Sequence, residues 1–190
     1  MSSAFYLLLF LAIFISHTTE AAVEESVTEI NGQRLKTETD YYYILPVVRG
    51  RGGGLTISKP CPNTVIQDQN EASKGLPVRF SPSVKSRFVR VSTDLNFIIA
   101  ASAIWKLGNF DETTNQTFVS TCGVQGNPGR TTVSNWFKID KFEDHYKMRF
   151  CPSVCDVCRV VCRDIGVLVQ DGKRSLVLSN VPLKVMFQRA

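Results

Sequence analysis

The chain has 190 residues, of which 44% are hydrophobic and 21% charged, and its net charge at pH 7 is +5. This length and apolar content suffice for one domain with a hydrophobic core that does not depend on the six cysteines. The basic residues are scattered and the net charge is no larger than solubility explains, so the composition argues against a nucleic-acid partner.

Residues 1–21 have the pattern of a secretory signal peptide. An apolar stretch, Ala4 to Ile15, is followed by polar residues, and Thr19 and Ala21 supply small side chains before a cleavage site. The stretch is shorter than the ~20 residues of a membrane-spanning helix, and no later segment approaches that length. We therefore expect no membrane anchor and a single domain, residues 22–190, in the oxidising secretory route.

The domain is predicted to consist of short strands separated by turns. Apolar, aromatic or alternating patterns occur at 41–45, 88–91, 97–107, 136–139, 146–150, 166–170 and 175–179. Asp171-Gly172, between the last two, favours a tight hairpin turn. Long apolar runs at helical spacing are missing. The pattern predicts an all-β domain, either a sandwich or a barrel.

Signals of catalysis are weak. His145 is the only histidine after the leader, and its polar surroundings predict a solvated side chain rather than a general base. The glycine-rich segment 49–54 lacks the Lys-Ser/Thr of a phosphate-binding loop, so it predicts a turn with positive φ angles. Trp105 and Trp136 lie in apolar strand contexts, which predicts core packing. We expect neither an enzyme nor a cofactor.

Six cysteines follow the leader, four of them as Cys151-x3-Cys155-x2-Cys158-x3-Cys162. Zinc ligands usually come as two pairs separated by a longer loop, whereas these four lie close together. In an oxidising compartment they predict disulfides and no metal. Six cysteines allow fifteen pairings, among which the sequence alone does not choose.

Many short motifs occur in one order along the chain: Val27–Leu35, Tyr42–Pro46, Arg49–Thr56, Cys61-Pro62, Val65–Asp68, Gly75–Val78, Gly126–Gly129, Trp136–Ile139, Tyr146–Pro152, Asp164–Val167 and Pro182-Leu183. In these motifs the chain resembles the plant Kunitz inhibitors of the soybean trypsin inhibitor type, and most of all their miraculin-like branch. It departs from them at Glu29, where the family usually has Asp, and by one extra residue before the tyrosines. The resemblance implies a β-trefoil of twelve strands, with a six-stranded barrel, three hairpins and approximate threefold symmetry.

The resemblance also implies a nested pairing in the cysteine cluster, with Cys151–Cys162 outside and Cys155–Cys158 inside. Cys61 and Cys122 then remain, and a bond between them would close a loop of about 60 residues, worth ~4 kcal/mol on the chain-entropy model. The alternatives are two free thiols, or one thiol that joins two chains. With every cysteine paired, we expect a monomer.

Inhibitors of this family act through one exposed loop, which falls here at residues 81–88, so the resemblance implies that the protease contacts are Ser83, Val84, Lys85, Ser86 and Arg87. A Lys or Arg bait suits trypsin, whose specificity pocket ends in a carboxylate. Alignment on Arg87-Phe88 places the reactive bond at Lys85–Ser86. Alignment on Ser81-Pro82 instead makes Val84 the bait, and Arg87 is the second basic candidate.

One family feature of this loop is missing. In trypsin-inhibiting relatives, an asparagine from the N-terminal segment braces the loop, whereas residues 36–39 here contain none. Thr37 offers a single hydroxyl in its place. A basic bait predicts trypsin as the target, and the missing asparagine predicts a weaker or differently aimed inhibitor.

The resulting expectation is a secreted inhibitor of trypsin-like serine proteases whose partner is a secreted or vacuolar enzyme. Asn115-Gln-Thr117 is a glycosylation sequon in a polar turn. The expected location is extracellular, in the apoplast, with the vacuole and the endoplasmic reticulum as alternatives. Two other functions remain open: a miraculin-like binding or defence protein without inhibitory action, and an inhibitor of cysteine or aspartic proteases that uses another loop.

Overall fold

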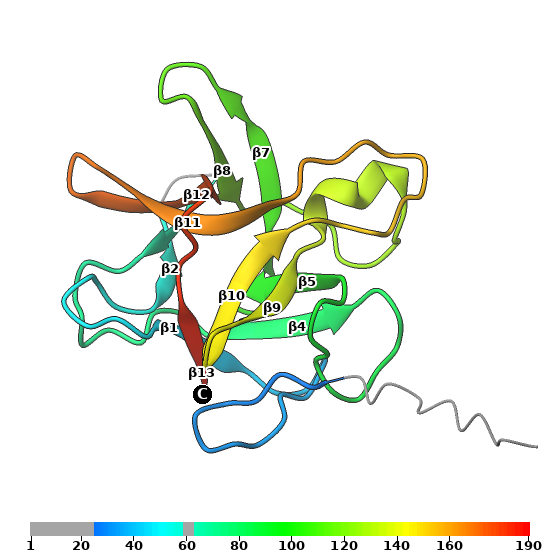
Figure 1. The fold of residues 1–190 in the computed structure, drawn as a ribbon, viewed down its shortest axis with the longest axis horizontal. Helices are drawn as coiled ribbons and strands as arrows, with labels where there is room; N and C mark the ends of the chain where they lie inside the picture. Colours follow the sequence, from blue (N-terminus) through cyan, green and yellow to red (C-terminus); the bar gives the residue numbers. More distant parts are fainter. Residues whose placement is uncertain (1–24, 59–62) are drawn as a thin grey trace, which may run out of the picture.

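The computed structural model describes residues 25–58 and 63–190. The predicted signal peptide and Cys61 lie outside these residues. The described chain forms thirteen strands and one short 3₁₀ helix, η1 (Arg130–Asn135) (Figure 1). The strands are β1 (Tyr42–Pro46), β2 (Leu55–Ile57), β3 (Val65–Gln67), β4 (Val78–Pro82), β5 (Leu95–Ile99), β6 (Ala103–Ile104), β7 (Lys106–Asp111), β8 (Gln116–Ser120), β9 (Lys138–Phe142), β10 (His145–Phe150), β11 (Arg163–Gln170), β12 (Lys173–Ser179) and β13 (Val185–Arg189).

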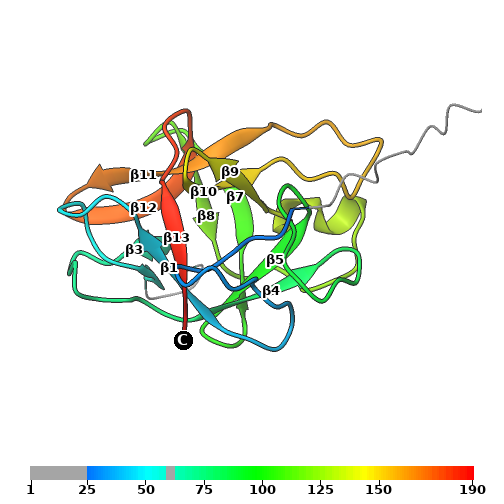
Figure 2. The ribbon, with the colours of Figure 1, turned by 60° about the horizontal axis from the view of Figure 1, so that its bottom comes forward.

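Six strands surround the core: β1, β4, β5, β9, β10 and β13. β1 pairs with β4 and β13, β4 pairs with β5, and β10 pairs with β9 and β13. β1 and β13 can be followed side by side in Figure 2. The ladder is not closed between β5 and β9. There, a single antiparallel bridge joins Leu95 to Phe137, the residue before β9, through N···O distances of 2.8 and 3.0 Å.

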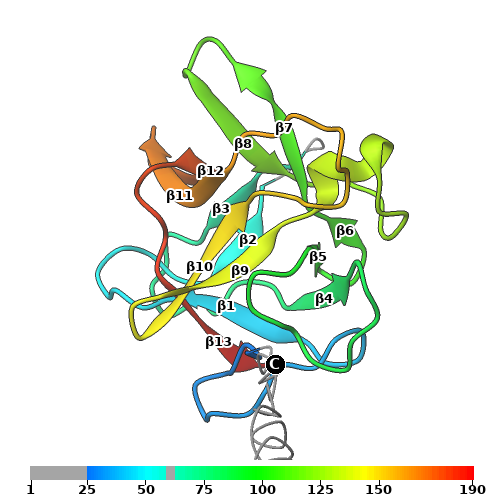
Figure 3. The same cartoon turned by 45° about the vertical axis from the view of Figure 1, so that its right-hand side comes forward.

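Three hairpins, β2–β3, β7–β8 and β11–β12, meet beside these strands (Figure 3). Each pair of hairpins shares one antiparallel contact: Ile66 with Ser175, Phe118 with Val177, and Thr64 with Ser120. Six barrel strands with three hairpins make this all-β chain a β-trefoil, as the resemblance implied. The described chain has thirteen strands instead of twelve because Trp105 separates β6 from β7.

Two sequence patterns are confirmed in detail. In β10, alternate residues Tyr146, Met148 and Phe150 are buried, as expected of a strand with one face on the core. Asp171 and Gly172 have φ angles of 50° and 74° and connect β11 to β12 as the predicted two-residue turn.

Two other strand predictions are wrong in part. Segment 88–91 forms only isolated bridges, because its partner is the irregular N-terminal segment, through Ser26 and Lys36. Segment 97–107 is divided among β5, β6 and β7, since Ala100 and Ala101 have positive φ angles (51° and 69°) that reverse the chain.

The core is rich in aromatic rings. The centroid of the Phe97 ring lies 4.7 Å from that of Trp105, 4.9 Å from Phe80 and 5.9 Å from Phe137, and all four side chains are fully buried. Trp136 is also fully buried, which confirms the predicted core role of both tryptophans. Edge-to-face and offset contacts of this kind add to the free energy gained by burial alone.

The glycine-rich segment forms the predicted turn. Gly50 and Gly52 have φ angles of 80° and 94°. Gly54 is needed for a second reason, because a Cβ atom there would overlap the carbonyl oxygen of Lys74. Within residues 25–58 and 63–190, no helix is long and apolar enough to cross a membrane.

An ion cluster joins the β9–β10 turn to the start of β13. Lys184 Nζ lies 2.7 Å from Glu143 Oε2 and also contacts Asp144, whose Oδ1 lies 2.8 Å from His145 Nδ1. His145 is the first residue of β10, and its side chain is 28% exposed, so it is less solvated than predicted. Hydrogen bonds from Lys184 and then His145 hold the pKa of Asp144 well below its ordinary value.

This cluster predicts a pH dependence of stability. Because the pKa of Asp144 is lower in the folded state, its charge stabilises the fold fully above the unfolded pKa of about 4, and this contribution is lost as the pH falls through the folded value. We expect Asp144→Asn to lower the melting temperature at pH 7, and its difference from wild type to shrink on acidification below about pH 4. Thermal unfolding across this range measures it. A difference independent of pH would contradict the assignment.

Candidate functional site

The candidate site is the loop between β4 and β5, residues 83–94. The sequence-based prediction began this loop at Ser81, but the structure places Ser81 and Pro82 in β4, where they pair with Asn96 and Leu95. The ladder continues to Pro82, so the irregular backbone begins at Ser83. The loop is thus anchored at each end by neighbouring barrel strands.

Side chains of residues 84–88 of this loop differ in exposure. Val84 is 77% exposed, and Lys85 and Arg87 are exposed. Ser86 and Phe88 are partly buried. Lys85 and Arg87 take part in no ion pair among the described residues, so their positive charges are available to a partner.

The N-terminal segment 35–37 runs along residues 86–89 of the loop and holds their backbone. The Val89 amide donates to the Leu35 carbonyl at 2.9 Å, and the Thr37 amide donates to the Arg87 carbonyl at 3.1 Å. The Thr37 hydroxyl donates to the Ser86 carbonyl, and the Thr37 side chain is buried, with 6% exposed. The one hydroxyl available in place of the family asparagine is therefore used on the loop, and two backbone bonds accompany it.

The candidate bait residues differ in whether their backbone carbonyls accept a hydrogen bond. The carbonyls of Ser86 and Arg87 are both occupied by Thr37. The carbonyls of Val84 and Lys85 accept no hydrogen bond from the described part of the chain. The guanidinium of Arg87 also lies 5.3 Å from the centroid of the Phe88 ring. Lys85 therefore combines a basic exposed side chain with an unoccupied carbonyl, and Arg87 does not.

Two hollows flank the loop. A groove of about 430 Å³ is lined on one side by Pro82, Val84 and Phe88 of the loop region, and on the other by Ser153 and Val154. A shallower hollow of about 600 Å³ borders Lys85 and Arg87, together with Glu38 and Gln125. Both hollows are lined in part by residues of the loop region, Pro82 and Ser86 among them.

The cysteine cluster lies across the groove from the loop. Cys151 is bonded to Cys162 and Cys155 to Cys158, with Cα–Cα distances of 4.3 and 5.4 Å, which is the nested pairing implied by the resemblance. Cys122 is exposed, and its predicted partner Cys61 lies outside the described residues, so that bond stays a prediction.

The predicted glycosylation site is remote from this loop along the chain. Asn115 is exposed, has a φ angle of 54° and lies at the turn between β7 and β8. This hairpin projects away from the barrel in Figures 1 and 3.

Two features next to the loop were not predicted. One is the backbone pairing of segment 35–37, for which residue types give no signal. The other is Asp94, the last residue of the loop, a carboxylate that is only 5% exposed and whose side-chain partner Ser153 is 59 residues away in the sequence. Long-range contacts of this kind leave no local pattern.

Comparisons with known proteins agree with the fold. The Kunitz legume family, described as trypsin and protease inhibitors, matches residues 27–189. Kunitz trypsin inhibitor 5 of Arabidopsis thaliana is 64% identical over the whole of both chains, and miraculin of Synsepalum dulcificum is 43% identical over 86% of this chain and 82% of its own. The solved structure of the Kunitz-type cysteine protease inhibitor PCPI-3 from potato is 31% identical, covers 88% of this chain and 98% of its own, and gives a TM-score of 0.76.

Proposed function

The chain belongs to the Kunitz legume family of trypsin and protease inhibitors, which are not enzymes, and from this membership we propose that it inhibits trypsin-like serine proteases through its Lys85–Ser86 bond. The protease would receive Lys85 in its specificity pocket, where a carboxylate pairs with the ammonium group. The backbone on either side would dock in the manner of a substrate.

One observation carries this assignment: Lys85 is the basic residue of the loop whose carbonyl is unoccupied in the described structure. A serine protease polarises the carbonyl before the scissile bond with the amide donors of its oxyanion hole. The carbonyl of Arg87 is already bound by the Thr37 amide and would have to break that bond first. This difference favours Lys85 over Arg87 as the bait, while charge favours Lys85 over Val84 for a trypsin-like target.

The brace from Thr37 explains how such a loop can inhibit instead of being consumed. Cleavage after Lys85 would make Ser86 a new amino terminus. Ser86 and Arg87 would stay in place, because both carbonyls are bonded to Thr37. A leaving group that does not depart favours re-formation of the bond, and a loop ordered in advance loses little entropy on binding.

The proposal is tested by titrating trypsin with the purified, oxidised chain beginning at Ala22. We expect stoichiometric one-to-one inhibition, and much weaker inhibition of chymotrypsin, whose pocket is hydrophobic. If trypsin stays fully active in a molar excess of the chain, the proposal is overturned. Papain belongs in the same series because the potato relative is a cysteine protease inhibitor. Papain inhibition that survives Lys85→Ala would assign that activity to another loop.

Replacing Thr37 by valine should weaken the brace. Valine has nearly the same shape but cannot donate to the Ser86 carbonyl, so a partly buried acceptor loses its partner at a cost of about 1–2 kcal/mol. We expect trypsin inhibition about 10-fold weaker and faster cleavage after Lys85. Thr37→Ser, which keeps the hydroxyl, is the matched control and should stay close to wild type. Equal inhibition by the valine and serine variants would show that the hydroxyl is dispensable.

We further propose that the protein is secreted after cleavage following Ala21, is a monomer and carries a glycan at Asn115. The exposure of Asn115 at a projecting hairpin supports glycan attachment. The intact mass of protein secreted by plant cells, before and after glycosidase treatment, tests both processing steps. A mass that includes residues 1–21, or that glycosidase and Asn115→Gln leave unchanged, would contradict them.

A further inference from the structure

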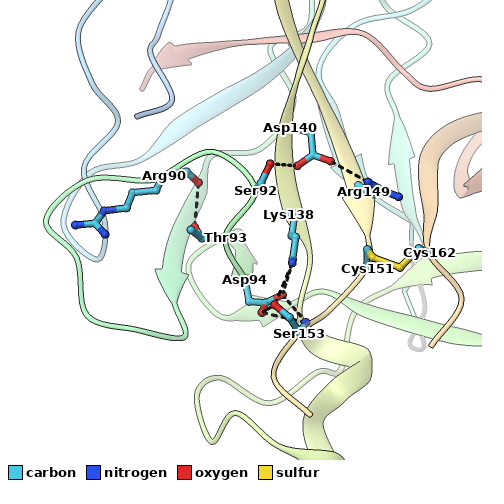
Figure 4. Close-up of polar contacts among 10 residues, drawn as sticks. All are labelled: Arg90, Ser92, Thr93, Asp94, Lys138, Asp140, Arg149, Cys151, Ser153 and Cys162. Atoms are coloured by element: carbon cyan, nitrogen blue, oxygen red, sulfur yellow. Dashed lines mark hydrogen bonds and ion pairs between the residues drawn. A yellow bond between two sulfur atoms is a disulfide. The ribbon is translucent and has the colours of Figure 1, made fainter. Parts of the chain in front are cut away.

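A buried carboxylate, that of Asp94, lies at the end of the β4–β5 loop. The Ser153 amide donates to both carboxylate oxygens of Asp94, at 3.2 and 3.1 Å, and its hydroxyl donates to Oδ2 at 2.6 Å. Lys138 Nζ lies 3.0 Å from Ser153 Oγ and 3.8 Å from Asp94 Oδ1. Figure 4 shows the three side chains converging between the loop, β9 and the disulfide segment.

Asp94 is also bonded to the start of the loop. The Ser83 amide donates to the Asp94 carbonyl at 2.9 Å, so the first and last residues of the loop are joined. Ser83 precedes the Lys85–Ser86 bond, whereas the Thr37 contacts all follow it. Thr37 therefore holds the segment after the reactive bond, and Asp94 holds the segment before it.

Ser153 in turn depends on the outer disulfide for its position. It lies two residues after Cys151, inside the ring that Cys151–Cys162 closes. Residues 151–162 belong to no strand, so Ser153 is not held by a ladder of its own. The inner bond, Cys155–Cys158, begins two residues after Ser153 and closes a smaller turn within the ring.

From this chain of contacts we propose that Asp94 is a positioning residue of the inhibitory loop, and that Ser153 and the Cys151–Cys162 bond fix its side chain. The inference rests on the proposed function. After cleavage at Lys85–Ser86, the bond between the Ser83 amide and the Asp94 carbonyl is the backbone hydrogen bond nearest to Lys85 that keeps the segment ending in Lys85 beside Ser86, just beyond the β4–β5 ladder. Loosening Asp94 then favours release of the cleaved ends, and the inhibitor becomes a substrate.

A neighbouring pair of side chains provides the control. Ser92 Oγ donates to Asp140 Oδ1 at 2.8 Å, which joins the same loop to β9 without involving the disulfide ring (Figure 4). Ser92→Ala and Ser153→Ala each remove one serine hydroxyl that is bonded to a carboxylate. They differ in whether that carboxylate belongs to Asp94, whose side chain is buried and whose backbone carbonyl accepts from the Ser83 amide.

The experiment compares these two variants, with Ser153→Thr as the conservative rescue. We expect Ser153→Ala to inhibit trypsin about 10-fold more weakly, as for the loss of one hydrogen bond to a charged group, and to raise the equilibrium ratio of cleaved to intact Lys85–Ser86 bond. Hydrogen exchange at the Ser83 amide should also become faster. Ser92→Ala and Ser153→Thr should match wild type in all three measurements.

The same assays test whether the Cys151–Cys162 bond fixes Ser153. Cys151→Ser/Cys162→Ser should reproduce the Ser153→Ala changes, and Cys155→Ser/Cys158→Ser should not. Unchanged exchange at Ser83 in Ser153→Ala would overturn the inference, and so would faster exchange with unchanged inhibition. If wild-type protein fails to inhibit trypsin, the proposed function fails, while exchange at Ser83 still decides whether Asp94 positions the loop.

Discussion

Replacing Lys85 by alanine is expected to weaken trypsin inhibition about 1,000-fold or more. A bait side chain that fills a specificity pocket is an interface hot spot, and removal of such a residue costs about 4 kcal/mol or more, equivalent to three powers of ten in affinity. Arg87→Ala is the matched control, since it removes an exposed basic side chain two residues from Lys85 in the same loop. We expect it to cost about 10-fold at most, as for a charge at the rim.

Inhibition constants for both variants follow from steady-state competition with a chromogenic substrate. Lys85→Leu tests the specificity of the bait position. A leucine bait suits the hydrophobic pocket of chymotrypsin, so this variant should inhibit chymotrypsin more strongly and trypsin more weakly than wild type. If Arg87→Ala abolished inhibition and Lys85→Ala preserved it, the reactive bond would lie after Arg87, and the occupied carbonyl of Arg87 would not be the discriminating feature.

Replacing Phe97 by alanine is expected to lower the free energy of unfolding by about 4 kcal/mol, within the usual range for a buried Phe→Ala change. The ring touches Trp105, Phe80 and Phe137, so its removal leaves a cavity between β4, β5 and the residue before β9. Phe110→Ala is the control, because that ring is 58% exposed in β7. Its effect should stay within about 0.5 kcal/mol.

Urea denaturation at 25 °C measures both changes. Folded molecules of the Phe97→Ala variant should inhibit trypsin about as strongly as wild type, because the cavity lies in the core and the Lys85 side chain is unchanged. Similar losses of stability in the two variants would contradict the placement of the core between these strands.

The fold was predictable wherever a local pattern coincided with a long-range one. Two short patterns were enough to predict local structure: the alternation of Tyr146, Met148 and Phe150 for a strand, and Asp171-Gly172 for a hairpin turn. Segment 88–91 also has β-forming residues, but a strand needs a regular partner, and the N-terminal segment offers only separate bridges. The reversal at Ala100 and Ala101 could not be predicted, because alanine rarely adopts positive φ angles.

The candidate site was likewise predictable only in part. Lys85 and Arg87 were found through the resemblance and their charge, but nothing in the sequence ranked them by the state of their carbonyls. That ranking depends on Thr37, which lies far from the loop along the chain and next to it in space. Asp94 gave no signal, because an aspartate is ordinarily exposed, and its burial depends on Ser153 and Lys138 from other elements.

The central claim is that the Lys85–Ser86 bond is the one offered to the protease. Incubation with a catalytic amount of trypsin at mildly acidic pH, followed by amino-terminal sequencing and intact-mass measurement, tests it most directly. The account predicts one new amino terminus at Ser86, in a fraction of molecules that reaches a plateau short of complete cleavage. A new terminus at Phe88, or progressive cleavage at many sites until no intact chain remains, would contradict it.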